Sequence, residues 1–327
     1  MTTSELLQAN LLSPITLSFA LGMAARVVRS EFSLPKDIYL GLSIFLLWSL
    51  GLQGGIELRH ARLDAIAWPA VATVLLGCLT PVTTYLAARR LGRFSAADSA
   101  ALAAHYGSVS AVTFIAAGAF VKSQGAEAEG FLPTLLTLLE SPGIAVALTI
   151  GALHTRAAER PVREVLHEVL TGRTMVLLLG GLAVGYLIGD AHWEVIGPLH
   201  DTTGPVFRGL LCLFMLEMGV TAGARLGDLR RVGGFLLGLG VLLPLAHGAL
   251  GAWAGHLAGL SVGGATVLGS MAASASYIAA PPAVRLTLPH ANPTYYLTAA
   301  LVITFPFNLL VGIPVYFRIA SWLGGPP

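Results

Sequence analysis

Long apolar stretches are the feature that most constrains how this chain can fold. A helix that crosses the hydrocarbon core of a bilayer needs about 20 apolar residues. The chain supplies such stretches repeatedly, between short charged breaks or breaks that contain Pro and Gly. Hydrophobic residues make up 55% of the chain and charged residues only 11%, whereas a soluble domain carries about 25% charged residues. The sequence therefore predicts an all-α integral membrane protein with about ten transmembrane helices. The expected spans are approximately 7–28, 38–57, 66–88, 95–121, 132–154, 174–193, 205–225, 233–257, 264–286 and 294–323.

Lys and Arg residues are concentrated in every second connection between these spans. Fourteen of the 19 Lys and Arg residues fall in one set of connections, such as Arg89, Arg90 and Arg93. Cytoplasmic loops carry the excess of Lys and Arg, so this set is predicted to be cytoplasmic and both termini outside a bacterial inner membrane. The net charge is only +2, and the basic residues sit at membrane edges. We therefore expect the lipid bilayer, and no nucleic acid, as a partner.

The two halves of the chain resemble each other weakly. Three windows match in the same order: 39–58 with 207–226, 108–110 with 274–276, and 138–144 with 302–308. An odd number of helices per repeat forces the second half to insert upside down, an arrangement common in secondary transporters. We expect a first five-helix repeat at 1–158, a cytoplasmic linker at 159–173 and an inverted five-helix repeat at 174–327. Apolar residues recur at helical spacing within 155–173, which predicts a surface-lying amphipathic helix or, alternatively, a docking element for a regulator.

Small residues and serines occupy the middle of the fourth and ninth spans. Gly beside Ser lowers the free-energy cost of unwinding a helix, since hydroxyl groups can satisfy the backbone groups that unwinding exposes. We therefore predict that both helices are discontinuous, at Ser108–Ser110 and near Ser274–Ser276. The amino end of a half-helix favours an anion. The alternative is that these small residues only allow close helix packing.

Cation ligands are predicted beside these breaks. Pro281 and Pro282 carry no N–H, so the carbonyls of Tyr277 and Ile278 lose their helical partners and could ligate Na⁺. Glu140 lies within an apolar span, where a carboxylate is costly and rarely without a role. It could ligate Na⁺, carry a proton or form a structural pair.

Three other polar residues in the apolar spans have open interpretations. Glu217 is a second intramembrane carboxylate and a candidate coupling residue or structural partner. His105 and His247 are expected to be hydrogen-bonded packing residues. No HExxH motif, nucleophile elbow, P-loop or clustered His/Cys site occurs in the sequence, so we do not expect an enzyme.

The chain resembles the cyanobacterial sodium-dependent bicarbonate symporter family over nearly its whole length. The segments that carry the resemblance are FRGLL (207–211), GDLR (227–230), AASASYIAAPP (272–282) and ANP (291–293). The resemblance implies ten helices in gate and core bundles, an elevator-like movement, a homotrimer and a small PII-like cytoplasmic regulator. Where the family typically reads Ser-Ser-Ser-Asp-Ile-Ser-Gly-Pro-Pro, this chain has Tyr277 in place of Asp and lacks two hydroxyl groups.

The resemblance also implies site residues by position. An anion cradle for bicarbonate would comprise Ser108, Val109, Ser110, Ala111, Val112, Ser274, Ala275 and Ser276. The coupling ion would be surrounded by Asp98, Thr113, Glu140 and Thr304. Asp98 has a second interpretation, as a helix-start charge that complements the helix dipole.

The leading hypothesis is therefore a secondary active importer of a small inorganic anion, bicarbonate first, by Na⁺ symport. One alternative is an H⁺-coupled carrier of another small anion or carboxylate, using Glu140 or Glu217. A second alternative is a channel or membrane-embedded sensor that binds the anion without pumping it.

Overall fold

The computed structural model describes residues 3–155 and 162–325, and every regular element among them is helical. The predicted boundary at 158/159 lies outside these residues. The amino-terminal half contains α1 (Thr3–Leu11), α2 (Pro14–Val27), α3 (Lys36–His60), α4 (Leu63–Leu86), η1 (Ala87–Leu91), α5 (Ala96–Gly107), α6 (Ala111–Ser123) and α7 (Leu132–Thr155). The remainder contains α8 (Val162–Thr171), α9 (Arg173–His200), α10 (Pro205–Ala224), η2 (Leu226–Asp228), α11 (Leu229–Leu257), α12 (Val262–Ala272), α13 (Ala280–Thr287), α14 (Pro293–Leu297), η3 (Thr298–Thr304), α15 (Phe305–Phe307), η4 (Asn308–Gly312) and α16 (Ile313–Gly324).

Seven helical stretches of the described chain are long and apolar enough to cross a membrane. One of them, Pro205–Leu257, contains two of the predicted spans, because α10 and α11 follow each other with only a short 3-10 turn between them. The predicted spans 7–28 and 264–286 correspond instead to helices too short to qualify. The chain is thus a multi-pass membrane protein, and the count of ten spans stays a prediction.

The first predicted span is interrupted rather than continuous. Helix α1 ends at Leu11 and α2 begins at Pro14, with the Ser13 hydroxyl accepting a hydrogen bond from the Thr16 amide at 3.2 Å. Ser at the cap and Pro at the first helical position are strong start signals for a helix.

The predicted helix in the central connection forms as α8.

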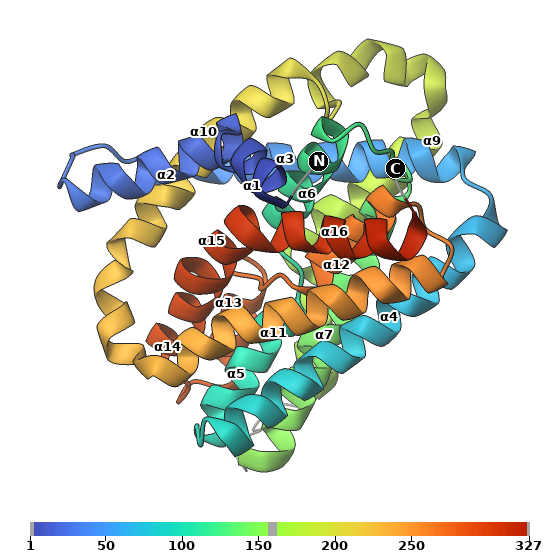
Figure 1. The fold of residues 1–327 in the computed structure, drawn as a ribbon. Coiled ribbons are helices and arrows are strands. Elements are labelled where there is room, and N and C mark those ends of the chain that lie inside the picture. The colour runs from blue at the N-terminus through green and yellow to red at the C-terminus, as the bar shows by residue number, and fades with distance from the viewer. Residues whose placement is uncertain (1–2, 156–161, 326–327) are drawn as a thin grey trace.

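Four helices form a bundle of two extensively packed pairs, α2 with α10 and α3 with α9 (Figure 1). We call it the paired-helix bundle. Glycines allow the backbones to approach closely: a Cβ added at Gly51 would lie 2.8 Å from the Leu178 carbonyl oxygen and 2.9 Å from the Gly181 Cα. Gly219, which matches Gly51 in the internal repeat, meets Gly22 in the other pair. Small residues play this role where membrane helices pack tightly.

Most of the other helices, α4–α7 and α11–α16, form a second unit, here called the broken-helix bundle (Figure 1). Helix α5 packs against α4 and α7, and α12 packs against α11 and α16. The last predicted span is one apolar stretch, Pro293–Gly324, but it contains the π-helical segments η3 and η4. Pro306 lies between these two segments, and proline removes a helical hydrogen bond. Hydropathy alone could not reveal this irregularity, because π-turns are as apolar as the helix around them.

Candidate functional site

The fourth predicted span breaks where its serines lie. Helix α5 ends at Gly107, Ser108 is extended (φ −104°, ψ 144°), and α6 begins at Ala111. The Ser110 hydroxyl caps α6 by accepting a hydrogen bond from the Thr113 amide at 3.2 Å. The sequence prediction of a discontinuous helix is confirmed at this position.

The ninth predicted span also breaks, over a longer non-helical segment from 273 to 279. The Ser276 hydroxyl accepts hydrogen bonds from the amides of Ala279 (3.2 Å) and Ala280 (3.4 Å) at the start of α13. Pro281 and Pro282 occupy the first turn of α13, where a missing N–H does no harm. The double proline therefore marks a helix start, and Tyr277 and Ile278 lie in the break before it.

The two breaks meet. The Ser276 amide donates to the carbonyl oxygens of His105 (2.7 Å) and Ser108 (3.1 Å). In the opposite direction, the Ser110 amide donates to the Ser274 hydroxyl oxygen at 2.9 Å. All these groups are buried, and a buried group without a hydrogen bond raises the free energy of the folded state. The hydrogen bonds therefore hold the two serine segments, Ser108–Ser110 and Ser274–Ser276, against each other.

A small cavity of about 20 Å³, here called the serine cavity, lies where the two breaks meet. A water molecule needs about 10–15 Å³ of free volume. The cavity therefore holds about one water molecule and is too small for an anion of four heavy atoms. The Tyr277 hydroxyl narrows the space by lying 3.4 Å from the Ser110 hydroxyl. A bound bicarbonate would require these walls to move apart. The residues lining the cavity are Leu47, Val109, Ser110, Ala111, Glu140, Thr174, Ser276, Tyr277, Ile278 and Ala279.

Glu140 supplies the carboxylate of this cavity. It lies in α7 and is 1% exposed, and its Oε2 atom has no hydrogen-bond partner in the described chain. The Ser108 hydroxyl interacts with this carboxyl group, and neither oxygen has another partner among the described residues. Buried polar atoms are nearly always hydrogen-bonded, so this pair of oxygens is suited to a cation or a proton. No group of three or more His, Cys, Asp or Glu side chains that could hold a metal ion occurs among the described residues.

Two other predicted ion ligands make hydrogen bonds away from the breaks. Asp98 lies at the start of α5, where it accepts from the Asn292 amide (2.8 Å) and the Ser95 hydroxyl (2.6 Å). This arrangement matches the helix-start interpretation of Asp98. The Thr304 hydroxyl donates to the Gly240 carbonyl at 2.8 Å and lies 2.6 Å from the Tyr106 hydroxyl.

Glu217 also lies elsewhere, in the paired-helix bundle. Its Oε2 atom accepts from the amide of Leu34, in the loop between α2 and α3, at 2.7 Å. The carboxylate therefore has a structural partner. Tyr39 of α3 packs against α10: its hydroxyl contacts the Met218 sulfur at 3.3 Å, and its ring stacks on Phe214.

The two buried histidines are hydrogen-bonded, as predicted. His247 Nε2 lies 2.7 Å from the Thr83 hydroxyl. His105 does more than fill space, because its Nδ1 lies 2.5 Å from the Ser276 carbonyl oxygen and its ring stacks on Tyr296. Sequence reasoning did not connect His105 with the second break. Its position two residues before the Gly107–Ser108 helix end was the available signal.

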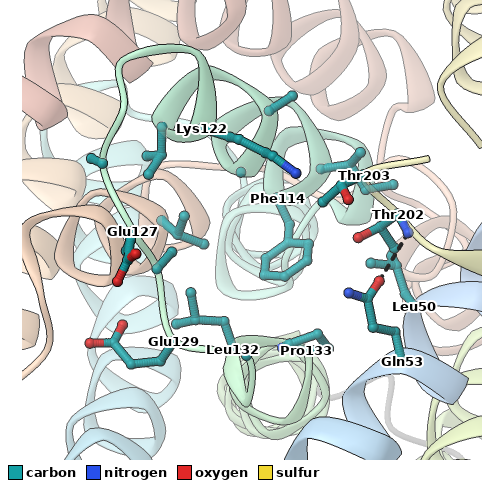
Figure 2. A pocket seen from close by; sticks show the side chains of 18 of the residues that line it. Leu50, Gln53, Phe114, Lys122, Glu127, Glu129, Leu132, Pro133, Thr202 and Thr203 are labelled. Atoms are coloured by element: carbon teal, nitrogen blue, oxygen red, sulfur yellow. Dashed lines mark hydrogen bonds between the residues drawn. The ribbon is translucent and has the colours of Figure 1, made fainter. Parts of the chain in front are cut away.

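Two larger cavities lie between the two bundles and were not predicted. The first, of about 370 Å³, is bounded by α3, α6, the α6–α7 loop and the α9–α10 loop. In it, Lys122 projects above Phe114, and Glu127 and Glu129 lie across from Thr202 and Thr203 (Figure 2). The second, of about 360 Å³, is bounded by the α1–α2 junction, α6, α10 and η4. Leu50 and Phe114 line the first cavity one helical turn from Leu47 and Ala111 of the serine cavity.

A search of curated protein sequences finds no match to this chain. A family profile described as Na⁺-dependent bicarbonate transporter superfamily matches residues 14–321. The matched segment includes both helix breaks, Glu140 and every helix from α2 to α15. Since the match covers nearly the whole sequence, the chain belongs to the Na⁺-dependent bicarbonate transporter superfamily.

Proposed function

We propose that the protein imports bicarbonate by Na⁺ symport, with the anion held between the two helix breaks. The observation that carries this proposal is the hydrogen-bonded contact between the two serine segments, with a buried carboxylate beside it. Na⁺ moving down its gradient would then supply the free energy to accumulate the anion.

The two breaks offer different chemistry. At the start of α6, the amides of Ala111 and Val112 belong to the first turn and have no helical partners. They point toward the break and suit an anion. At the start of α13, Ser276 already accepts from two amides and the prolines have none to give. The anion would therefore bind mainly at the α6 end, with Ser274 and Ser276 completing the cradle.

The cation would bind on the other side of the same cavity. Glu140 Oε2 and the Ser108 hydroxyl are adjacent oxygens with no further partner in the described part of the chain, and the Tyr277 and Ile278 carbonyls lie in the neighbouring break. Hard cations prefer such oxygen ligands. Thr113, two residues into α6, would contribute to the same region. Placing Na⁺ beside the anion lowers the cost of burying either charge.

The packing of the helices supports two inverted repeats. In the amino-terminal half, the consecutive long helices α2 and α3 pair with α10 and α9, which follow each other in the opposite order in the second half. This reversed pairing of helices from the two halves is the arrangement that a pseudo-two-fold axis in the membrane plane produces. In the proposed elevator-like movement, the paired-helix bundle would be the gate and the broken-helix bundle the moving core. The homotrimer and the PII-like regulator stay predictions from the family resemblance.

Uptake of labelled bicarbonate into proteoliposomes tests the proposal. An inward Na⁺ gradient should drive accumulation above the external concentration, and an equal K⁺ gradient at the same membrane potential should not. Liposomes without protein give the background. Equilibration without accumulation would instead indicate a channel or sensor.

The burial of the Glu140 carboxyl group, with only the Ser108 hydroxyl beside it among the described residues, favours one rival mechanism, in which Glu140 carries a proton. Uptake that is unchanged without Na⁺ but abolished by a protonophore would establish that mechanism. It would also rule out Na⁺ symport.

A further inference from the structure

Lys122 and Arg208 are two basic side chains with no assigned role in the proposed transport site. Lys122 is on α6 of the broken-helix bundle and Arg208 is on α10 of the paired-helix bundle. Both are exposed, and neither lies within ion-pair distance of a carboxylate in the part of the chain that the structure describes. Lys122 is also among the few basic residues in the connections predicted to face outward, and Arg208 lies near the start of the predicted span 205–225.

The same two residues line both of the larger cavities. The walls of the 370 Å³ cavity also contain Glu127 and Glu129, which offset the positive charge there (Figure 2). Glu129 is engaged by the Ser261 amide at 2.6 Å. The 360 Å³ cavity differs, because Lys122 and Arg208 are the only charged residues among the described ones in its wall. Its other polar groups are neutral, those of Asn10, Ser13, Ser123 and Cys212.

A cavity with apolar walls and charges of one sign concentrates ions of the opposite sign. Here the walls are largely Pro14, Ile15, Ala116, Phe120 and Leu309, and the charge comes from one cation of each bundle. An oxyanion between Lys122 and Arg208 would therefore contact both bundles. Ala119 and Lys122 line both cavities, so this position adjoins the first cavity, which approaches the serine segments through Phe114.

We propose that the 360 Å³ cavity is an outer binding site for a small oxyanion such as bicarbonate, held between Lys122 and Arg208 before it reaches the serine segments. The identity of the anion rests on the proposed bicarbonate transport, whereas the anion selectivity of the cavity does not. Asp201, in the α9–α10 loop, accepts hydrogen bonds from the Thr203 amide and hydroxyl at 2.8 Å and is not in the cavity wall.

Cys212 provides a native probe, since it lies in the cavity wall one helical turn from Arg208. In a Cys78→Ala protein it is the only thiol, because the chain has two cysteines. The measurement is the rate at which Cys212 reacts with methanethiosulfonates of matched size, one anionic and one cationic, in phospholipid-free detergent. If Cys212 reacts with neither reagent, Ser123→Cys places an exposed thiol in the same wall.

The anionic reagent should be favoured, and that preference should fall about tenfold in Lys122→Gln/Arg208→Gln, in line with the strength of focused fields in charged clefts. Lys122→Arg should keep the preference. Millimolar bicarbonate should slow the anionic reagent more than chloride of equal ionic strength does, and only while both cations are present. In Ser110→Phe, which alters the serine cavity alone, the preference and the protection should persist even where transport fails.

Three results would overturn the proposal. The first is an unchanged reagent preference in the double variant. The second is bicarbonate protection no greater than that by chloride. The third is a preference that develops only when phospholipid is added, because the cations would then serve lipid phosphate groups. Failure of uptake by the unmodified protein would count against bicarbonate transport and leave the reagent preference as a separate result.

Discussion

His105 contacts both backbone polar groups of Ser276, the amide N–H and the carbonyl oxygen. Its carbonyl oxygen accepts from the Ser276 amide at 2.7 Å, and its Nδ1 lies 2.5 Å from the Ser276 carbonyl oxygen. A carbonyl oxygen can only accept, so Nδ1 carries the hydrogen. Within the described ranges, Nε2 has no hydrogen-bond partner. One histidine at the end of α5 therefore fixes the backbone of the other helix break.

His105→Ala should loosen this contact. It would leave the buried Ser276 carbonyl without a donor, which lowers the free energy of unfolding by about 1–3 kcal/mol. We expect a lower melting temperature in detergent and a slower uptake of bicarbonate. His105→Asn is the matched control, because an Asn amide can place an N–H near the position of Nδ1. Equal melting temperatures for the Ala and Asn variants would show that the hydrogen bond has no positioning role.

Ser110→Phe and Ser276→Phe should each abolish transport, because the cavity of about 20 Å³ between the two breaks has no room for a phenyl ring. Both serines also cap helices. Ser110→Ala serves as the control, since it removes the cap at a cost of about 1 kcal/mol without filling the cavity. Size-exclusion chromatography would verify that each variant is folded. Normal uptake by both Phe variants would place the substrate elsewhere.

Glu140→Gln should make the rate of bicarbonate uptake independent of the Na⁺ concentration. The change keeps the shape of the side chain and removes its charge, so we expect stimulation by Na⁺ to be lost while the melting temperature is retained. Glu217→Gln is the comparison, because Glu217 accepts from the Leu34 amide in the α2–α3 loop and lies outside the cavity. Initial rates of uptake at increasing Na⁺ concentration provide the measurement. An identical Na⁺ response in Glu140→Gln and the unmodified protein would exclude Glu140 as a coupling ligand.

Gly51→Ala should destabilise the paired-helix bundle. The added Cβ would lie 2.8 Å from the Leu178 carbonyl oxygen on α9, a backbone atom that cannot move alone. Overpacking of this kind costs about 1–3 kcal/mol. Gly41→Ala, on the same helix, has nothing within 4 Å of the added atom. The melting temperature should fall for the first variant and stay level for the second, and equal values would contradict the close approach of α3 and α9.

Local features of the sequence determined the class of fold and the positions of its breaks. Membrane helices are recognised by the length of their apolar runs, and a break by Gly, Ser and Pro at particular positions, so Ser108–Ser110 and the Pro281–Pro282 start of α13 could be predicted. The interruption at Ser13 and the π-helical segments near Pro306 escaped prediction. Ser13 and Pro14 form a local start signal that apolar length alone overlooks. The π-helical segments carry no such signal, and packing against distant helices decides where they form.

Only the tertiary structure decided which predicted groups share a site. Ser110 and Ser274, or His105 and Ser276, are more than 160 positions apart, and no local pattern encodes their contact. The same long-range packing put Glu140 in the cavity wall and gave Asp98, Thr304 and Glu217 partners elsewhere. It also brought Lys122 and Arg208 to one cavity. The sequence determines where a helix can bend and which charges enter the membrane, whereas a binding site forms only where several helices converge.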